Sequence, residues 1–417
     1  MGKIFIKNRG TTCMENIEKK STSMPLVFII LLGTMTAFGP LLSDMYSPAL
    51  PLVQKDLMTS TSQTQLTLSI AMIGIAMGQF MFGIMADRMS RRTLAMMILV
   101  MLIVASLCIA ISHSVYVLLV LRFIQGLSGG GAIVIARAIA GESFKGAHLS
   151  RFFTALMVVN GMISILAPLA NALLLSFGTW RYIFLALAAI GLILFISVLM
   201  QPHMKTIQHS QTRAEKLSVV FKDFIQLLQT PSFVLPMFLQ GVTYIMIFSY
   251  GAGAPFITQN VYGMTPQSFS LLMVIIGIGL IISSQVSNLC LRFMPQLHVL
   301  TLFIMIQVVG ALFTIIVCLC HLPIAYLVVS LFITVTPVTA IGPIAFSLAM
   351  QMRTGGSGSA SSLLGLFQFI LGSSIAPVIG IQGPESVMPY CVVLGVTVVL
   401  LLGIGHLTFH RLKHQIQ

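Results

Sequence analysis

Twelve long apolar runs divide this chain, and they limit its possible folds more than any other feature of the sequence. The hydrocarbon core of a bilayer is about 30 Å thick, so an α-helix needs roughly 20 apolar residues to cross it. Backbone N–H and C=O groups find no partners in lipid, which restricts spanning segments to helices and closed barrels. The runs have helical length and predict an all-α integral membrane protein built as two bundles of six helices. The predicted spans cover residues 25–46, 64–86, 94–112, 115–137, 152–175, 181–200, 233–257, 268–290, 298–319, 323–349, 360–381 and 387–409.

Composition excludes a water-soluble protein. Only 7% of the 417 residues are charged, against about a quarter in ordinary soluble domains. Hydrophobic residues make up 57% of the chain, and its mean hydropathy is +1.02. A soluble core of this length has no use for so much apolar surface, so we expect the lipid bilayer to be the main partner of the chain.

The basic residues indicate the orientation in the membrane. The formal charge of +13 does not predict nucleic-acid binding, because the basic residues lie between apolar runs and form no patch with aromatic side chains. An even number of spans puts both termini on one side. Nineteen Lys and Arg residues fall on that side, and Lys55 and Arg181 fall on the other. The bias predicts cytoplasmic termini and a multi-pass protein of the bacterial inner membrane.

The predicted domains follow from the spans. A cytoplasmic tail (1–24) precedes the first bundle (25–200), a cytoplasmic central loop (201–232) joins it to the second bundle (233–410), and a second tail (411–417) closes the chain. The later part of the central loop has the pattern of an amphipathic surface helix. Met1 and Met24 both remain possible starts.

The two bundles resemble each other at one pair of positions. Pro168 in the fifth span and Pro377 in the eleventh both follow an alanine. Proline removes a helix hydrogen bond, so both spans are expected to kink. Matching kinks in two halves indicate a transporter with a central cavity between its repeats.

Charged residues inside the spans are rare and mark functional sites. Asp44 lies at the end of the first span, in "GPLLSDMYSPALP", and Arg122 lies in the fourth span at a similar depth. We expect them to pair, and a change of conformation that separates them would bind or release a proton. The alternative is a solvated Asp44 in the headgroup region. Small residues share their helix faces: Gly33, Ala37 and Pro40 with Asp44, and Gly126 with Gly129 or Gly130 for Arg122.

The loop after the second span, "GIMADRMSRR" (83–92), combines a glycine, an acid and three arginines. Gly83 and Asp87 are four residues apart on one helix face, where the glycine permits close packing. Asp87 is expected to meet the N-terminus of the eleventh span, which begins at "GGSGSASS" (355–362).

The pattern Gly83-x-x-x-Asp87-Arg88-x-x-Arg91-Arg92 resembles the signature loop of the major facilitator superfamily, with Ser90 in place of a usual glycine. "RFIQGLSGGGA" (122–132) resembles the fourth-span motif of its drug–proton antiporters, whereas the fifth-span motif is degenerate around Pro168. "SDMYSPALP" (43–51) and residues 253–272 and 342–369 are most similar to the Bcr/CflA subfamily. The likeness covers all twelve spans.

This resemblance implies export of a small, partly apolar compound, often an antibiotic, driven by inward proton flow. It implies that Asp44 and Arg122 couple transport to protons. It also implies that Asp87, Arg88 and Glu142 form a cytoplasmic charge cluster that locks the outward-facing state, and Arg137 is expected to join that cluster. We expect no cofactor besides the proton as coupling ion, no metal and no enzymatic activity.

The second half carries few charges, so its contribution to a substrate site must come from polar and aromatic groups. With 27 Met and 27 Phe residues, the lining is expected to be soft and adaptable. The candidate substrate-binding residues of the whole chain are Tyr46, Asn160, Gln240, Tyr244, Tyr250 and Gln368.

The sequence thus predicts a monomeric, proton-coupled antiporter of small amphipathic drugs. The alternatives are an exporter of a metabolite such as a nucleoside or amino acid, and a non-transporting sensor. A membrane-embedded enzyme would need more intramembrane acids or histidines. Cys318, Cys320 and His321 are too few for a closed zinc site. Residues 126–142 are glycine-rich but lie in an apolar run, so they predict no dinucleotide site.

Overall fold

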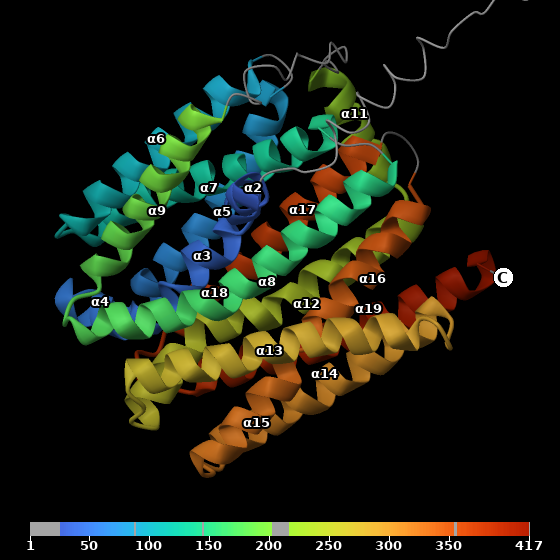
Figure 1. Cartoon of the computed structure of the whole chain (residues 1–417). Coiled ribbons are helices and arrows are strands. Elements are labelled where there is room, and N and C mark those ends of the chain that lie inside the picture. The colour runs from blue at the N-terminus through green and yellow to red at the C-terminus, as the bar shows by residue number, and fades with distance from the viewer. Residues whose placement is uncertain (1–25, 87–88, 144–145, 202–216, 354–356, 417) are drawn as a thin grey trace, which may run out of the picture.

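A computed structural model describes residues 26–86, 89–143, 146–201, 217–353 and 357–416 (Figure 1). These residues form helices and contain no strand, so the all-α prediction is confirmed. The helices of the first half are α2 (Leu26–Thr36), α3 (Phe38–Asp44), η1 (Ser47–Ala49), α4 (Leu50–Asp56), α5 (Thr61–Ala86), α6 (Arg91–Ala110), α7 (Val115–Ser143), α8 (Gly146–Ser176) and α9 (Arg181–Met200). Those after it are α11 (Leu217–Leu228), α12 (Pro231–Phe256), η2 (Ile257–Val261), α13 (Pro266–Cys290), α14 (Gln296–Leu319), α15 (Ile324–Val335), α16 (Val338–Gln351), α17 (Ser357–Ser374), α18 (Ala376–Ile379) and α19 (Met388–Ile416).

The first predicted span is a bent pair of helices. The described residues hold eleven helices long and apolar enough to cross a membrane, or twelve when the segments Phe28–Thr36 and Phe38–Asp56, at 55° to each other, count as one. The bend falls at Ala37, next to Thr36, whose carbonyl has no donor from Pro40 because the proline ring has no N–H. The chain then continues beyond the predicted end at residue 46, through η1 and α4.

Each half has its own apolar core. One cluster of buried side chains draws almost entirely on α2 to α9, and a second draws on α12 to α19. Figure 1 shows the blue-to-green helices of the first half beside the yellow-to-red helices of the second. The halves meet where α5 packs against α17 and α18, and where α8 packs against α13.

Glycines set the closest helix contact in the first half. A Cβ atom on Gly126 would lie 2.0 Å from the carbonyl oxygen of Ala71, and one on Gly130 would lie 2.1 Å from that of Ile75. Gly78 faces Leu127 in the same way. No residue larger than glycine fits there without moving a backbone, so the small face predicted around Arg122 brings α7 directly onto α5.

The predicted prolines act differently from each other. α8 runs continuously through Pro168, whereas the eleventh span breaks at Ile375, and Pro377 stands in the first turn of α18. The helix is thus interrupted in the eleventh span and not in the fifth, and a kink at Pro168 stays a prediction. A proline within the first turn of a helix loses no hydrogen bond, because that N–H would have no partner there.

The later part of the central loop is helical, as predicted. Asp223 of α11 accepts a hydrogen bond of 3.0 Å from Ser359 at the start of α17, and Phe224 packs against Phe80 of α5. Helix α11 thus contacts both halves at the end of the bundle that carries Arg92, Arg137 and Arg353, which we call the basic end.

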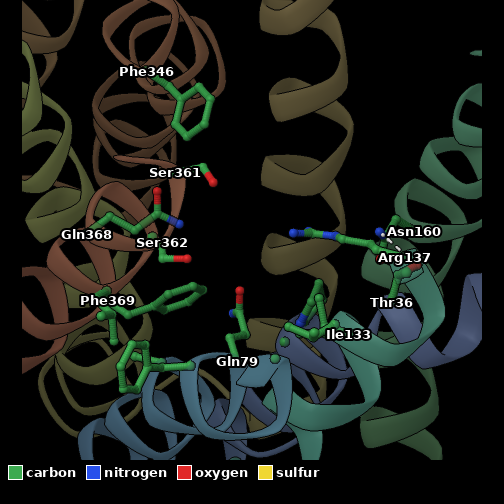
Figure 2. A pocket seen from close by; sticks show the side chains of 18 residues that line it. Thr36, Gln79, Ile133, Arg137, Asn160, Phe346, Ser361, Ser362, Gln368 and Phe369 are labelled. Atoms are coloured by element: carbon green, nitrogen blue, oxygen red, sulfur yellow. Dashed lines mark hydrogen bonds between the residues drawn. The ribbon is translucent and has the colours of Figure 1, made fainter. Parts of the chain in front are cut away.

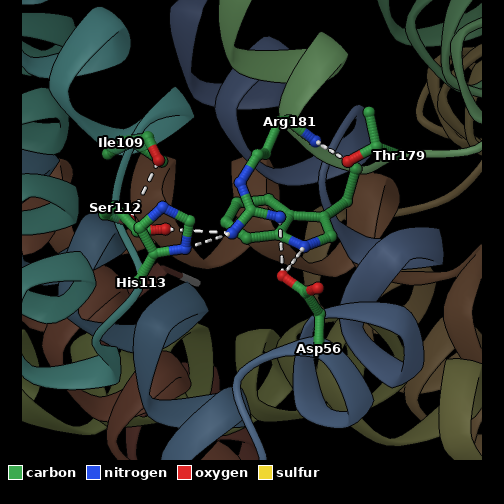
Figure 3. A network of polar contacts seen from close by, with 7 residues as sticks. Asp56, Ile109, Ser112, His113, Thr179 and Arg181 are labelled. Atoms are coloured by element: carbon green, nitrogen blue, oxygen red, sulfur yellow. Dashed lines mark hydrogen bonds and ion pairs between the residues drawn. The ribbon is translucent and has the colours of Figure 1, made fainter.

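A polar network lies at the opposite end, which carries Lys55 and Arg181 (Figure 3). The Arg181 guanidinium donates to Asp56 at 2.6 Å and to the carbonyl of Ser112 at 3.1 Å, and the Trp180 indole N–H donates to Asp56 at 3.0 Å. His113 Nδ1 lies 3.3 Å from the same guanidinium. These contacts tie α4 to the start of α9 and to the turn between α6 and α7.

Candidate functional site

A cavity of about 520 Å³ lies between the two halves (Figure 2). Drug-sized ligands occupy pockets of about 300–1,000 Å³. Its walls come from α2, α3, α5, α7 and α8 on one side and from α16 and α17 on the other. The cavity therefore lies at the interface that a transporter of two bundles would open and close.

The described lining residues combine apolar rings with neutral polar groups and a single charge. Phe80, Phe346 and Phe369 supply aromatic surface. Figure 2 shows the Arg137 side chain reaching into the space, toward the wall that carries Ser362 and Gln368. The polar side chains of the lining, apart from Arg137, are Thr36, Gln79, Asn160, Ser361, Ser362 and Gln368.

The cavity occupies only the basic part of the interface. On α5 it is lined from Ala76 to Gly83, near the end of the helix, whereas Ser62 and Gln65, near its start, bond across to the second half. Ser62 donates to the carbonyl of Pro377 at 2.7 Å, and Gln65 donates to that of Ala252 at 3.1 Å.

Two further hydrogen bonds complete this seal. Gln259 of η2 donates to the carbonyl of Pro48 at 2.9 Å, and Ser47 donates to that of Gly251. Gly380 permits the close approach, because a Cβ there would lie 2.6 Å from the backbone nitrogen of Ser62. The halves are thus joined at the end away from Arg137, and separated by the cavity at the basic end.

Arg122 is completely buried, and each of its three guanidinium nitrogens donates a hydrogen bond. Its guanidinium donates to the carbonyls of Thr67 and Leu42 at 3.2 and 3.0 Å, and to the Gln125 side chain at 2.7 Å. It also lies 4.4 Å from the ring centroid of Tyr46, a cation–π contact. Three helices, α3, α5 and α7, are held together by this one side chain.

The predicted pair of Asp44 and Arg122 does not form in this structure. Asp44 is half-buried at the end of α3, and its carboxylate accepts a hydrogen bond of 2.7 Å from Ser43. The physical reason is that Arg122 already finds acceptors at the end of α3, where the last carbonyls of a helix lack partners. Among the described residues, the ion pair joins Asp56 and Arg181 instead.

The predicted substrate residues separate into three groups. Asn160 and Gln368 line the cavity. Gln240 lies behind the lining and donates to the Gln368 side chain. Tyr46, Tyr244 and Tyr250 are not part of the lining: Tyr46 packs on Arg122, Tyr250 is buried beside Phe269, and the ring of Tyr244 lies against Gly342.

The signature-loop residues are only partly described. Asp87 and Arg88, and the side chain of Glu142, lie outside the described residues. Gly83 lines the cavity and makes no close helix contact, since its nearest neighbour would be a Val134 methyl at 3.8 Å. Arg91 is buried and donates to the carbonyl of Ala86, while Arg92 donates to that of Leu199 at 2.8 Å and so joins α6 to α9.

Sequence reasoning missed several lining residues. Gln79 lies one helical turn before Gly83 and so on the same face of the helix. A polar side chain on that face, inside an apolar run, was a signal that could have identified it as a lining residue. Ser361 and Ser362 belong to a serine-rich segment that we interpreted only as a helix start. Phe346 and Phe369 carried no signal, because 27 phenylalanines share the same apolar context.

Comparison with known proteins agrees with this architecture. The family model of the Major Facilitator Superfamily matches residues 28–377. A solved structure of the nucleoside transporter NupG superimposes with a TM-score of 0.75 at 14% identity, over 92% of this chain and 98% of that one. At that identity the likeness concerns the fold alone.

Curated relatives are similar over nearly their whole length. The MFS-type transporter YdgK of Bacillus subtilis is 32% identical over 94% of this chain and 96% of its own. The bicyclomycin resistance protein homolog of Haemophilus influenzae is 23% identical (95% and 99%), and the multidrug resistance protein MdtL of Escherichia coli is 24% identical (90% and 94%). These are transporters and not enzymes, and their names agree with the resemblance to the Bcr/CflA subfamily. Since the family model covers residues 28–377 and YdgK is 32% identical over nearly its whole length, the chain belongs to the major facilitator superfamily of membrane transporters.

Proposed function

We propose that this transporter exports small amphipathic compounds in exchange for protons, by alternating access. The observation that most supports this proposal is the interface between the halves. It has a drug-sized cavity at the basic end and hydrogen bonds between the halves at the other end. Two relatives named for resistance to drugs support the choice of substrate. A cavity of mixed aromatic and amide lining suits partly apolar molecules.

The orientation completes the proposal. The excess of Lys and Arg at the basic end favours a cytoplasmic position for that end and for both termini. The structure then corresponds to an inward-facing state of a monomer in the bacterial inner membrane, ready to take a compound from the cytoplasm. Release requires the seal at the opposite end to break.

Asp44 is the proposed proton-binding group. It lies within the first membrane-crossing segment, whereas Asp56 is bound by Arg181, Asp223 is in α11 and Glu385 is in the loop before α19. Arg122 contributes by holding the backbone around Leu42, two residues before Asp44. We propose that a proton from outside neutralises Asp44 in the outward state, and that it leaves to the cytoplasm when a new compound binds.

The test is Asp44→Asn in inside-out vesicles with a pH-sensitive dye and a panel of antibiotics. A transported compound collapses the pH gradient in wild-type vesicles. The rate of this collapse is expected to be at least tenfold lower in the variant, because its amide cannot carry a proton. Glu385→Gln removes a carboxylate from the exposed loop and is expected to behave as wild type. Full gradient collapse by Asp44→Asn at equal membrane levels would exclude this role for Asp44.

A further inference from the structure

Arg137 carries the one charge among the described lining residues, and it indicates which compounds the cavity accepts. We propose that Arg137 selects substrates by charge, so that the cavity takes neutral and anionic amphipathic compounds and rejects organic cations. This inference rests on the proposed function, since it names the substrate class of the same cavity.

Arg137 is placed to meet a bound molecule directly. It lies on α7, its side chain is exposed to the cavity, and Figure 2 shows it extending from the first half toward the α17 wall. Among the described residues, none forms a hydrogen bond or an ion pair with it. Its guanidinium can therefore offer several N–H donors to a ligand.

No acid among the described lining residues balances this charge. Of these 18 residues, Arg137 is the one that carries a charge. A second positive charge about 6 Å from the guanidinium, at an effective dielectric constant of about 20, is repelled strongly enough to lower its binding affinity at least tenfold. An organic cation in the same cavity meets that penalty, whereas a neutral compound does not and an anion is attracted.

The opposite wall adds further donors. Gln240 donates its amide to the Gln368 side-chain oxygen, which leaves the Gln368 amide N–H groups for other acceptors. Ser362 lies beside Gln368 and offers a hydroxyl. Arg137 and Gln368 thus present donors from two sides, which suits a carboxylate, sulfonyl or carbonyl oxygen, while Phe80 and Phe346 contact the apolar part.

Charge selection can be measured with three naphthalene probes of similar size: a naphthalenesulfonate, its neutral N-methyl sulfonamide, and a naphthylmethyl trimethylammonium. Equilibrium dialysis against the full chain in nanodiscs measures binding, and proteoliposomes measure transport. We expect the sulfonate and the sulfonamide to bind at least tenfold more tightly than the ammonium probe.

Substitutions at Arg137 test whether this residue causes the charge selection. Arg137→Gln is expected to weaken sulfonate binding at least tenfold and to strengthen ammonium binding, with little change for the neutral sulfonamide, whose unchanged affinity also reports a folded cavity. Arg137→Lys keeps the charge and is expected to keep the preference. Arg292→Gln removes a positive charge from the loop between α13 and α14, outside the cavity, and is expected to bind all three probes as wild type does.

The outcomes separate this inference from the proposed function. Equal binding of the ammonium and sulfonate probes by wild-type protein overturns charge selection, even if all three are exported. Absence of binding by all three probes overturns it as well. Selective binding without transport or proton movement supports charge selection and overturns proton-coupled export. If Arg137→Gln does not fold, the wild-type series together with Arg137→Lys still decides the question.

Discussion

Arg122 shows how a buried charge can serve the scaffold. A guanidinium is costly to bury and is tolerated only with its donors satisfied. Its donors are accepted by the carbonyls of Leu42 and Thr67 and by the side-chain oxygen of Gln125, and the Tyr46 ring adds a cation–π contact. Asp44 is left without this partner, which is consistent with its proposed role as the proton-binding group.

Replacing Arg122 should destabilise the protein strongly. Arg122→Gln would leave the buried carbonyl of Leu42 without a donor and remove the side-chain donor to Thr67, with an expected loss of about 3 kcal/mol. Thermal unfolding of the purified protein in detergent measures it. Arg353→Gln removes an exposed arginine and should change the midpoint little. A midpoint for Arg122→Gln as high as that of Arg353→Gln would contradict the scaffold role.

Helices α5 and α7 depend on glycines for their contact. Gly126 and Gly130 of α7 face the backbone of α5, and Gly78 of α5 faces that of α7. The helices approach so closely that a backbone oxygen occupies the place of a Cβ atom. Their rigid contact carries both Arg122 and the cavity residue Arg137, which fixes where α7 presents each side chain.

A single methyl group should disturb this contact. Gly130→Ala places a Cβ about 2.1 Å from the carbonyl oxygen of Ile75, and relief of that overlap costs about 1–3 kcal/mol. Gly403→Ala provides the matched control, since nothing lies within 4 Å of its Cβ position. Unfolding curves of both variants in detergent test the contact, and a Gly130→Ala protein as stable as Gly403→Ala would show that the helices can separate without cost.

The molecule as a whole has two different ends. Hydrogen bonds from Ser62, Gln65 and Gln259 join the halves at the end away from Arg137, and the cavity separates them at the basic end. The two halves have separate apolar cores, so they can move as bodies about this interface. Few polar contacts then decide which end is closed.

Weakening the seal should shift the molecule toward the outward-open state. The double variant Ser62→Ala, Gln259→Ala lacks two hydrogen bonds of about 1 kcal/mol each. This loss predicts a roughly thirtyfold increase in the ratio of outward-open to inward-open molecules. Spin labels at Lys55 and Gln382, on a background without native cysteines, report the separation of the halves at that end.

Ser176→Ala is the control for this measurement, because its hydroxyl bonds within α8 at the same end. It should leave the distance distribution unchanged. A distribution in the double variant identical to that of Ser176→Ala would show that these two hydrogen bonds do not hold the seal.

The sequence by itself determined the membrane-spanning helices. About twenty apolar residues in lipid must pair their backbone N–H and C=O groups within the segment, and the α-helix is the structure that does so. The sequence also determined the glycine face of Arg122, because helical spacing places residues four apart on one side. A kink was expected at Pro377, and the helix is interrupted there between α17 and α18.

Tertiary structure alone decided what each polar residue touches. The carbonyl of Leu42 became an acceptor for Arg122 only because α3 ends at Asp44, which no spacing rule reveals. Likewise Arg137 faces the cavity, since the separation of the two halves at the basic end decides which side of α7 is accessible. The charge cluster expected of Arg137 with Asp87, Arg88 and Glu142 stays a prediction. Contacts between segments hundreds of residues apart depend on how the bundles pack, and local sequence carries no record of that packing.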